Sequence, residues 1–157
     1  MDERERLIRQ FDGAREQVRA ALAGIDPRMA VNPRWSVKEL VAHLAGWDAV
    51  TGDALRAHAT GDLAETPAKG GINAYNARSV AARRGLSYEE TVADWEQASD
   101  GLRQALVDMP AERLSEKMVF PWGPKGTVAR AVAIMAGHEE EHAHELHVLR
   151  GEMEQAE

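Results

Sequence analysis

The chain has 157 residues, of which 44% are hydrophobic, and a formal net charge of −7. This length and composition allow one globular domain with a real core, and they exclude a disordered chain and a membrane span, which needs ~20 apolar residues in a row. The negative charge disfavours nucleic-acid binding. The charged N-terminus shows no secretory signal and the chain has no cysteine, which together indicate a cytoplasmic protein. A single domain is expected over residues 1–157.

Hydrophobic residues recur at helical spacing over residues 3–24, which predicts a first helix, and Pro27 disfavours its continuation. A second helix begins where Ser36 and Glu39 can form a capping box, an arrangement that satisfies free backbone amides at a helix start. This helix runs to about His58, which lies among polar residues and is predicted to be on the surface.

A loop containing glycine and proline, over residues 61–71, separates the second helix from a short helix at residues 72–84. A second capping box at Ser87 starts another long helix, which continues to about Val107. Residues 115–126 are expected to be irregular, because two prolines in that segment remove backbone hydrogen-bond donors.

The final helix is predicted to start at the N-cap Thr127 and to end near Gly151. Four long amphipathic helices without a convincing strand pattern predict an all-α four-helix bundle. The connections between them are long, so the short extra helix is expected to cross one end. In such bundles, metal and ligand sites form from side chains that point inward from facing helices.

Four of the six histidines lie within ten residues on the final helix, and two of them face the predicted core. His138 and His142 are four residues apart, so they lie on one side of the helix and can share a metal ion. His144 and His147 point to the opposite side, toward solvent. On the second helix, His43 borders the hydrophobic face and is the candidate third ligand.

Three neutral imidazoles with an open position suit Zn, Ni, Fe or Mn, and such an ion can activate water or polarise a bound oxygen or thiolate. The alternatives are a group of hydrogen-bonded histidines in the core or a groove, or part of a solvated polar face. Residues 138–142 also match the zinc-protease pattern H-E-x-x-H, but Glu145 and Val148 stand where its extended form needs glycine and histidine, so a peptidase is not predicted. Glu139 and Glu145 are candidates for orienting a ligand or accepting a proton.

An open metal position must face a cavity, whose walls should come from segments outside the regular helix packing. Small-molecule cavities typically combine aromatic walls with a few polar groups. The candidates for substrate binding are therefore Trp47, Asn73, Tyr75 and Trp122. For Trp122 the alternative is a purely structural role, in which it covers the end of the bundle.

Two motifs carry a resemblance to a known family. The segment W-S-V-K-E-L-V-A-H-L-A-G-W at residues 35–47, together with H-x-x-x-H at residues 138–142, resembles the DinB-like family, which includes YfiT-like metal-dependent hydrolases. The order of elements is similar over nearly the whole chain. The resemblance implies an up-down-down-up four-helix bundle and a metal ion held by three histidines, which by position are His43, His138 and His142.

The resemblance also implies a function. Members include mycothiol-dependent maleylpyruvate isomerases and bacillithiol transferases, which implies a metal-dependent transferase, isomerase or hydrolase that acts on a small molecule, with a low-molecular-weight thiol as a further cofactor. Residues 72–76 and 120–123 also resemble the colibactin self-protection branch, part of which needs no metal triad. The alternatives are therefore a metal-independent self-protection hydrolase and a non-catalytic protein that binds or sequesters small molecules. A homodimer is left open, and neither nucleic acid nor membrane is an expected partner.

Overall fold

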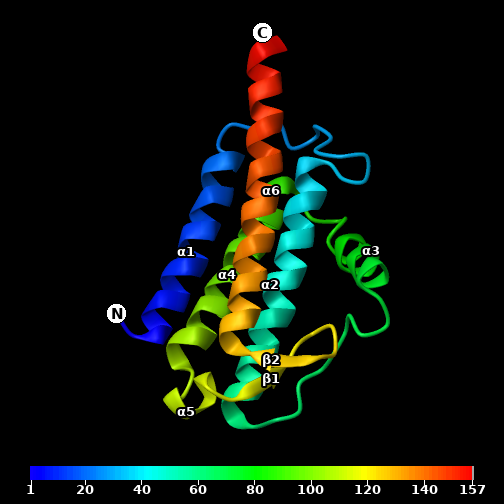
Figure 1. The fold of residues 1–157 in the computed structure, drawn as a ribbon. Coiled ribbons are helices and arrows are strands. Elements are labelled where there is room, and N and C mark those ends of the chain that lie inside the picture. Colours follow the sequence, from blue (N-terminus) through cyan, green and yellow to red (C-terminus); the bar gives the residue numbers. More distant parts are fainter. Residues whose placement is uncertain (157) are drawn as a thin grey trace.

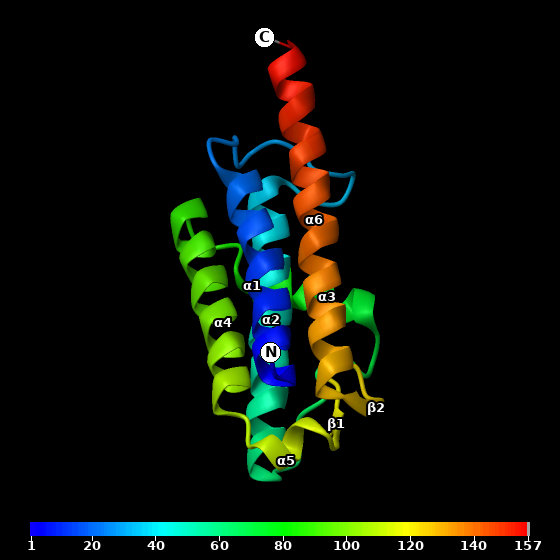
Figure 2. The ribbon, with the colours of Figure 1, turned by 60° about the vertical axis from the view of Figure 1, so that its left-hand side comes forward.

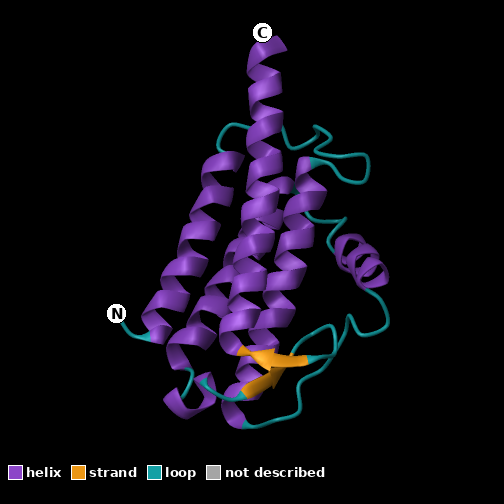
Figure 3. Cartoon of the chain, viewed as in Figure 1, coloured by secondary structure: helices purple, strands orange, loops and turns teal. Residues whose placement is uncertain are grey.

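The computed structural model describes residues 1–156 and consists mainly of helices (Figure 1; Figure 3). The four long helices are α1 (Glu3–Leu22), α2 (Val37–Thr60), α4 (Tyr88–Asp108) and α6 (Val128–Ala156). The shorter elements lie in the connections and are α3 (Ile72–Ala82), α5 (Ala111–Leu114), β1 (Lys117–Val119) and β2 (Lys125–Thr127). Within the described residues, no helix is both long and apolar enough to cross a bilayer.

The long helices run up, down, down and up, so α1 and α6 point one way and α2 and α4 the other (Figure 1; Figure 2). The most extensive packing is between α1 and α6 and between α2 and α4. Of these two pairs, α2 and α4 are consecutive long helices, and because they are parallel the connection between them must run back along the bundle and is long. The predicted bundle, with its short extra helix in that connection, is thereby confirmed. The short helix α3 does not cross one end of the bundle as expected, however, but lies beside α2 (Figure 1).

Side-chain caps fix where the long helices begin. Both predicted capping boxes are present: Ser36 and Glu39 bond each other's backbone amides at 3.2 Å, and Ser87 and Glu90 do so at 3.0 Å. At the start of α6, the hydroxyl of Thr127 accepts a hydrogen bond from a first-turn amide at 3.0 Å. These caps set the register of α2 and α6, the two helices that carry the predicted metal ligands.

Three further predictions from the sequence are wrong. Within the segment expected to be irregular, β1 and β2 pair as an antiparallel hairpin around the proline-containing turn. Helix α6 continues to Ala156, because Gly151 lowers helix stability without preventing the helical conformation. His58 is buried, with Nε2 2.7 Å from the carbonyl oxygen of Arg113, so it ties the end of α2 to α5.

Two hydrophobic clusters fill the bundle, and buried polar side chains lie between them. In α1, α4 and α6, the buried residues Arg15, Ser99 and Glu139 lie between the positions that feed the two clusters, and in α2 the buried Asp48 directly follows Trp47, the first α2 residue of one cluster. Glu139 directly follows His138 in α6. The polar layer therefore lies directly behind the predicted metal ligands.

Helix α3 lies beside α2 and is held there by two buried hydrogen bonds (Figure 1). The hydroxyl of Tyr75 donates to the carbonyl oxygen of Gly46 at 2.9 Å, and Trp47 Nε1 donates to Asn76 Oδ1 at 2.8 Å. A Cβ atom added at Gly46 would lie 1.8 Å from the hydroxyl oxygen of Ser79. The close approach of α3 to α2 therefore needs glycine at position 46.

This close approach can be tested by adding one methyl group. The Gly46→Ala variant should lower the free energy of unfolding by about 1–3 kcal/mol, the usual cost of overpacking a tight contact. Adding Ser79→Ala, which removes the clashing oxygen, should recover part of the loss in a double-mutant cycle measured by urea denaturation. Equal losses with and without Ser79→Ala would contradict the contact.

Candidate metal centre

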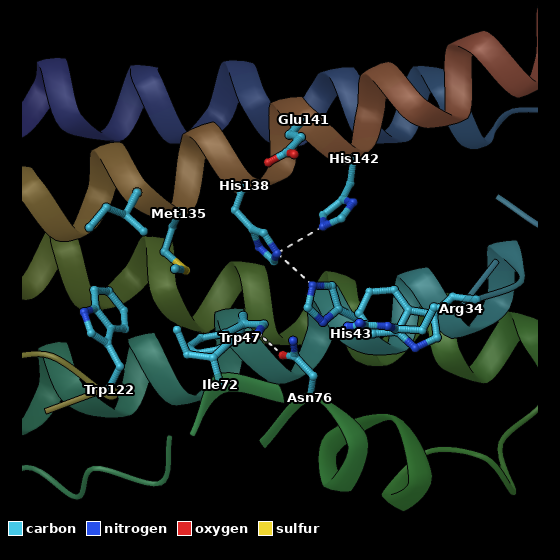
Figure 4. Close-up of a pocket in the computed structure, with 12 residues that line it drawn as sticks. Arg34, His43, Trp47, Ile72, Asn76, Trp122, Met135, His138, Glu141 and His142 are labelled. Atoms are coloured by element: carbon cyan, nitrogen blue, oxygen red, sulfur yellow. Dashed lines mark hydrogen bonds between the residues drawn. The ribbon is translucent and has the colours of Figure 1, made fainter. Parts of the chain in front are cut away.

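Three imidazole rings from α2 and α6 converge at one point of the bundle (Figure 4). The Nε2 atom of His138 lies 2.8 Å from that of His43 and 3.1 Å from that of His142. The candidate ligand atoms of the three residues lie within 4.8 Å of one another. The structure thus brings together the three histidines that the sequence singled out, while His144 and His147 are exposed on the opposite side of α6.

Burial keeps the two deeper histidines neutral. Burial is the main cause, and the facing imidazoles are a smaller one, of a pKa lowered to about 2 for His43 and to about 3 for His138. Because a neutral imidazole keeps a lone pair on one ring nitrogen, both residues can act as metal ligands near neutral pH.

Neighbouring side chains hold two of the rings. Trp35 packs on the ring of His43 with a centroid distance of 4.3 Å. His142 Nδ1 donates to Glu145 Oε1 at 2.6 Å, and Asn32 donates to the other carboxylate oxygen of Glu145 at 3.2 Å. A carboxylate in this position fixes the ring hydrogen on Nδ1 and leaves Nε2 as an acceptor. Glu145 therefore orients a candidate ligand, one of the two roles considered for it.

The donor set fits a divalent metal ion. With its hydrogen on Nδ1, His142 Nε2 can only accept, so a single hydrogen on His138 Nε2 would have to serve both of its imidazole neighbours. One cation between the three nitrogens would instead satisfy all three lone pairs. Ions that favour imidazole, such as Zn, Ni, Fe or Mn, match this chemistry.

A cavity of about 480 Å³ opens beside the histidines. Its lining combines four aromatic or imidazole rings of α2 and α6 with aliphatic, aromatic and polar side chains from other segments; the lining residues are Arg34, Trp35, His43, Trp47, Ile72, Asn76, Trp122, Ile134, Met135, His138, Glu141 and His142. A mostly apolar cavity with a few polar groups is typical of a small-molecule site.

Of the four predicted substrate-binding residues, Trp47 and Trp122 line this cavity, while Asn73 and Tyr75 do not. Asn73 is exposed and lines a neighbouring cavity, whereas Tyr75 bonds the backbone of α2. The face that α3 presents to the cavity carries Ile72 and Asn76, which lie four residues apart. That helical spacing was the signal in the sequence that could have identified Asn76.

Glu139 faces the interior of the bundle rather than the cavity. Its side chain is fully buried, and Trp95 Nε1 donates to its Oε1 at 3.2 Å. Burial and the neighbouring carboxyl of Asp48 hold the pKa of Glu139 well above its usual value. Glu139 therefore stays protonated and bonds the Asp48 carboxylate, which also accepts a hydrogen bond from Ser99 at 2.7 Å.

Trp122 offers a test of the cavity. It is half-buried and stacks on Phe120 with a centroid distance of 4.8 Å. Trp122→Ala should keep the fold and the metal but weaken the binding of a small thiol to the metal-loaded protein, measured by calorimetry. The comparison is Trp95→Ala, in the core, which should cost ~3–5 kcal/mol of stability. A loss of that size for Trp122→Ala, with unchanged thiol affinity, would assign Trp122 to the core.

A known family model matches most of the chain. The family model described as the mycothiol maleylpyruvate isomerase N-terminal domain matches residues 29–147. Among curated proteins, none matches the chain in sequence.

Solved structures share the same fold. Crystal structures of the mycothiol-dependent maleylpyruvate isomerase and of a point mutant are 17% and 16% identical to this chain, each with a TM-score of 0.78. Each match covers 92% of this chain and 61% of the isomerase chain, so this chain spans less than two thirds of the isomerase. An uncharacterised protein from Escherichia coli UTI89 is 20% identical, with a TM-score of 0.75 and a coverage of 91% and 90% of the two chains.

Proposed function

Since the chain belongs to the mycothiol maleylpyruvate isomerase N-terminal domain family, we propose that it is a metal-dependent enzyme that acts on a small molecule. His43, His138 and His142 would hold the divalent ion. The observation that carries this proposal is the convergence of three Nε2 atoms beside a cavity of about 480 Å³. The family favours a reaction that uses a low-molecular-weight thiol, in group transfer or isomerisation, and hydrolysis is the second candidate.

Different residues would hold the metal ion, orient its ligands and contact the substrate. A bound ion supplies Lewis-acid chemistry toward an oxygen or sulfur atom of the substrate. Glu145 keeps the ring hydrogen of His142 on Nδ1, while Trp35 fixes the plane of His43. Trp47 and Trp122 would form aromatic walls against the bound molecule. The metal ion would thus be held by α2 and α6, and the substrate would be contacted by Trp47 and Trp122.

A turnover assay separates the candidate functions. Metal-loaded and metal-free protein would be incubated with electrophiles, with and without mycothiol, bacillithiol or glutathione. Turnover that needs both metal and thiol supports transfer or isomerisation, and turnover that needs metal alone supports hydrolysis. Turnover without metal would point to a metal-independent hydrolase, and tight binding without turnover to a sequestering protein. Either of the last two results would overturn the proposal.

Removal of the metal should leave the fold intact. Both hydrophobic clusters close the bundle without the ion, unlike a zinc finger, which has little core of its own. After chelation we expect the helical circular dichroism signal to remain and the melting temperature to fall only modestly, since any ligand that binds the native state stabilises it by mass action. Loss of the helical signal on chelation would show that the ion has a structural role.

A further inference from the structure

Asn76 is a buried amide whose orientation is fixed. It lies on α3 with 7% of its surface exposed, and its Oδ1 accepts a hydrogen bond from Trp47 Nε1 at 2.8 Å. Because an indole N–H can only donate, the amide oxygen must face Trp47, and the amide nitrogen must face away from it. Figure 4 shows this oxygen on the side of Trp47.

The surroundings prevent the amide from turning over. The indole of Trp47 packs edge-on against Tyr75 with a centroid distance of 4.8 Å, and the hydroxyl of Tyr75 is itself bonded to Gly46. A turned amide would place two donors opposite each other and lose the buried bond to Trp47. The Asn76 nitrogen therefore keeps its direction whether or not a ligand is present.

The amide nitrogen of Asn76 has no acceptor among residues 1–156, although Asn76 lines the cavity beside the histidines. This nitrogen is not itself fully buried but is open to the cavity, where it can bond water. A ligand oxygen that replaces this water meets a donor that is already oriented. Arg34, which lines the same cavity, packs over the Trp35 ring at 5.5 Å and makes no ion pair with the described residues. Glu141 is the one carboxylate of the lining, and it is exposed.

We propose that Asn76 is a ligand-binding residue, whose Nδ2 donates a hydrogen bond to a carbonyl or carboxylate oxygen of the molecule in the cavity. An oriented donor at one wall and a guanidinium without an ion pair at the same cavity favour a ligand that carries acceptor oxygens. This inference rests on the proposed function, because it assigns a partner to the substrate of the same site.

Calorimetry with nickel-loaded protein tests the assignment with two probes. Pyruvate carries acceptor oxygens, while imidazole binds a metal ion through nitrogen and offers no such oxygen. Asn76→Asp keeps an oxygen for Trp47 but replaces the donor with an acceptor. It should weaken pyruvate binding at least ~10-fold, the loss expected for a hydrogen bond to a charged group, and leave the affinities for nickel and imidazole unchanged.

Two further variants separate this effect from charge and from folding. Gln97→Glu adds the same negative charge on the exposed face of α4 and should leave all three affinities unchanged. Asn76→Ala removes the donor without adding charge and should also weaken pyruvate binding selectively. A loss of nickel and imidazole binding along with pyruvate binding in both Asn76 variants would assign Asn76 a structural role and overturn the inference.

The remaining outcomes distinguish this inference from the function on which it rests. Parental protein that binds nickel and imidazole but not pyruvate would overturn the role of Asn76 and leave the metal site standing. Unchanged pyruvate affinity in both Asn76 variants would have the same meaning. Failure of the parental protein to bind nickel would overturn the proposed function and this inference together.

Discussion

The His138→Ala variant should lose tight binding of a divalent metal ion. His138 Nε2 lies between the other two imidazoles, at 2.8 and 3.1 Å, so its removal takes away the central one of three ligands. We expect the dissociation constant to rise at least ~100-fold, because the loss of a direct ligand should exceed the 10–100-fold cost of losing a group that only supports one. Elemental analysis and calorimetric titration of the purified protein measure this change.

Matched controls are available on the same helix. His144→Ala and His147→Ala remove exposed imidazoles from the opposite face of α6 and should leave metal affinity unchanged. His43→Ala should reproduce the loss, because it removes the one ligand that comes from α2. Full metal occupancy in His138→Ala, or an equal loss in His144→Ala, would contradict the site.

The second large effect is expected at the buried carboxyl pair. Glu139→Ala should destabilise the protein by about 3–5 kcal/mol, because it leaves the Asp48 carboxylate buried without its main partner. Glu139→Gln keeps the shape, an oxygen that accepts from Trp95 and a donor toward Asp48, so it should fold with nearly parental stability. Urea denaturation of the metal-free proteins measures both changes.

The pH dependence of the Glu139→Gln variant gives an independent check. The folded protein keeps a proton on Glu139, whereas the unfolded chain releases it above the ordinary carboxyl pKa of 4.5. The native state of the parent therefore binds the additional proton, and the free energy of unfolding falls as the pH rises above about 4.5. Glutamine cannot titrate, so the variant should gain stability relative to the parent over this range. A pH-independent difference would show that Glu139 is ionised in the folded protein.

Much of the fold follows from local signals in the sequence. The capping boxes at Ser36 and Ser87 and the periodic hydrophobic faces determine where the long helices begin and which sides they bury. The i, i+4 spacing of His138 and His142, on a face otherwise apolar, likewise placed two of the three converging rings. These features depend on a few neighbouring residues, which is why a single sequence is enough to read them.

Contacts between segments that are distant in the sequence could not be predicted from such local patterns. Asn76 acquires its orientation from Trp47, which lies on another helix, and Glu139 becomes a buried carboxyl only because Asp48 and Trp95 meet it in the bundle. His58 sits in a polar stretch of sequence, yet it is covered by the segment around Arg113. In each case the environment of the side chain is set by tertiary packing, which local spacing does not encode.

Because α3 is attached to the outside of the bundle, the cavity wall that it forms can change in sequence independently of the bundle. This helix rests mainly on α2 and contributes little to either hydrophobic cluster, while the three histidines belong to the bundle itself. Changes in Ile72, Asn76 or the loop before them can therefore alter which molecule fits without disturbing the ion-binding residues. Proteins with this fold can therefore acquire different substrates through sequence changes in a segment of about one dozen residues, while the bundle and its histidines stay the same.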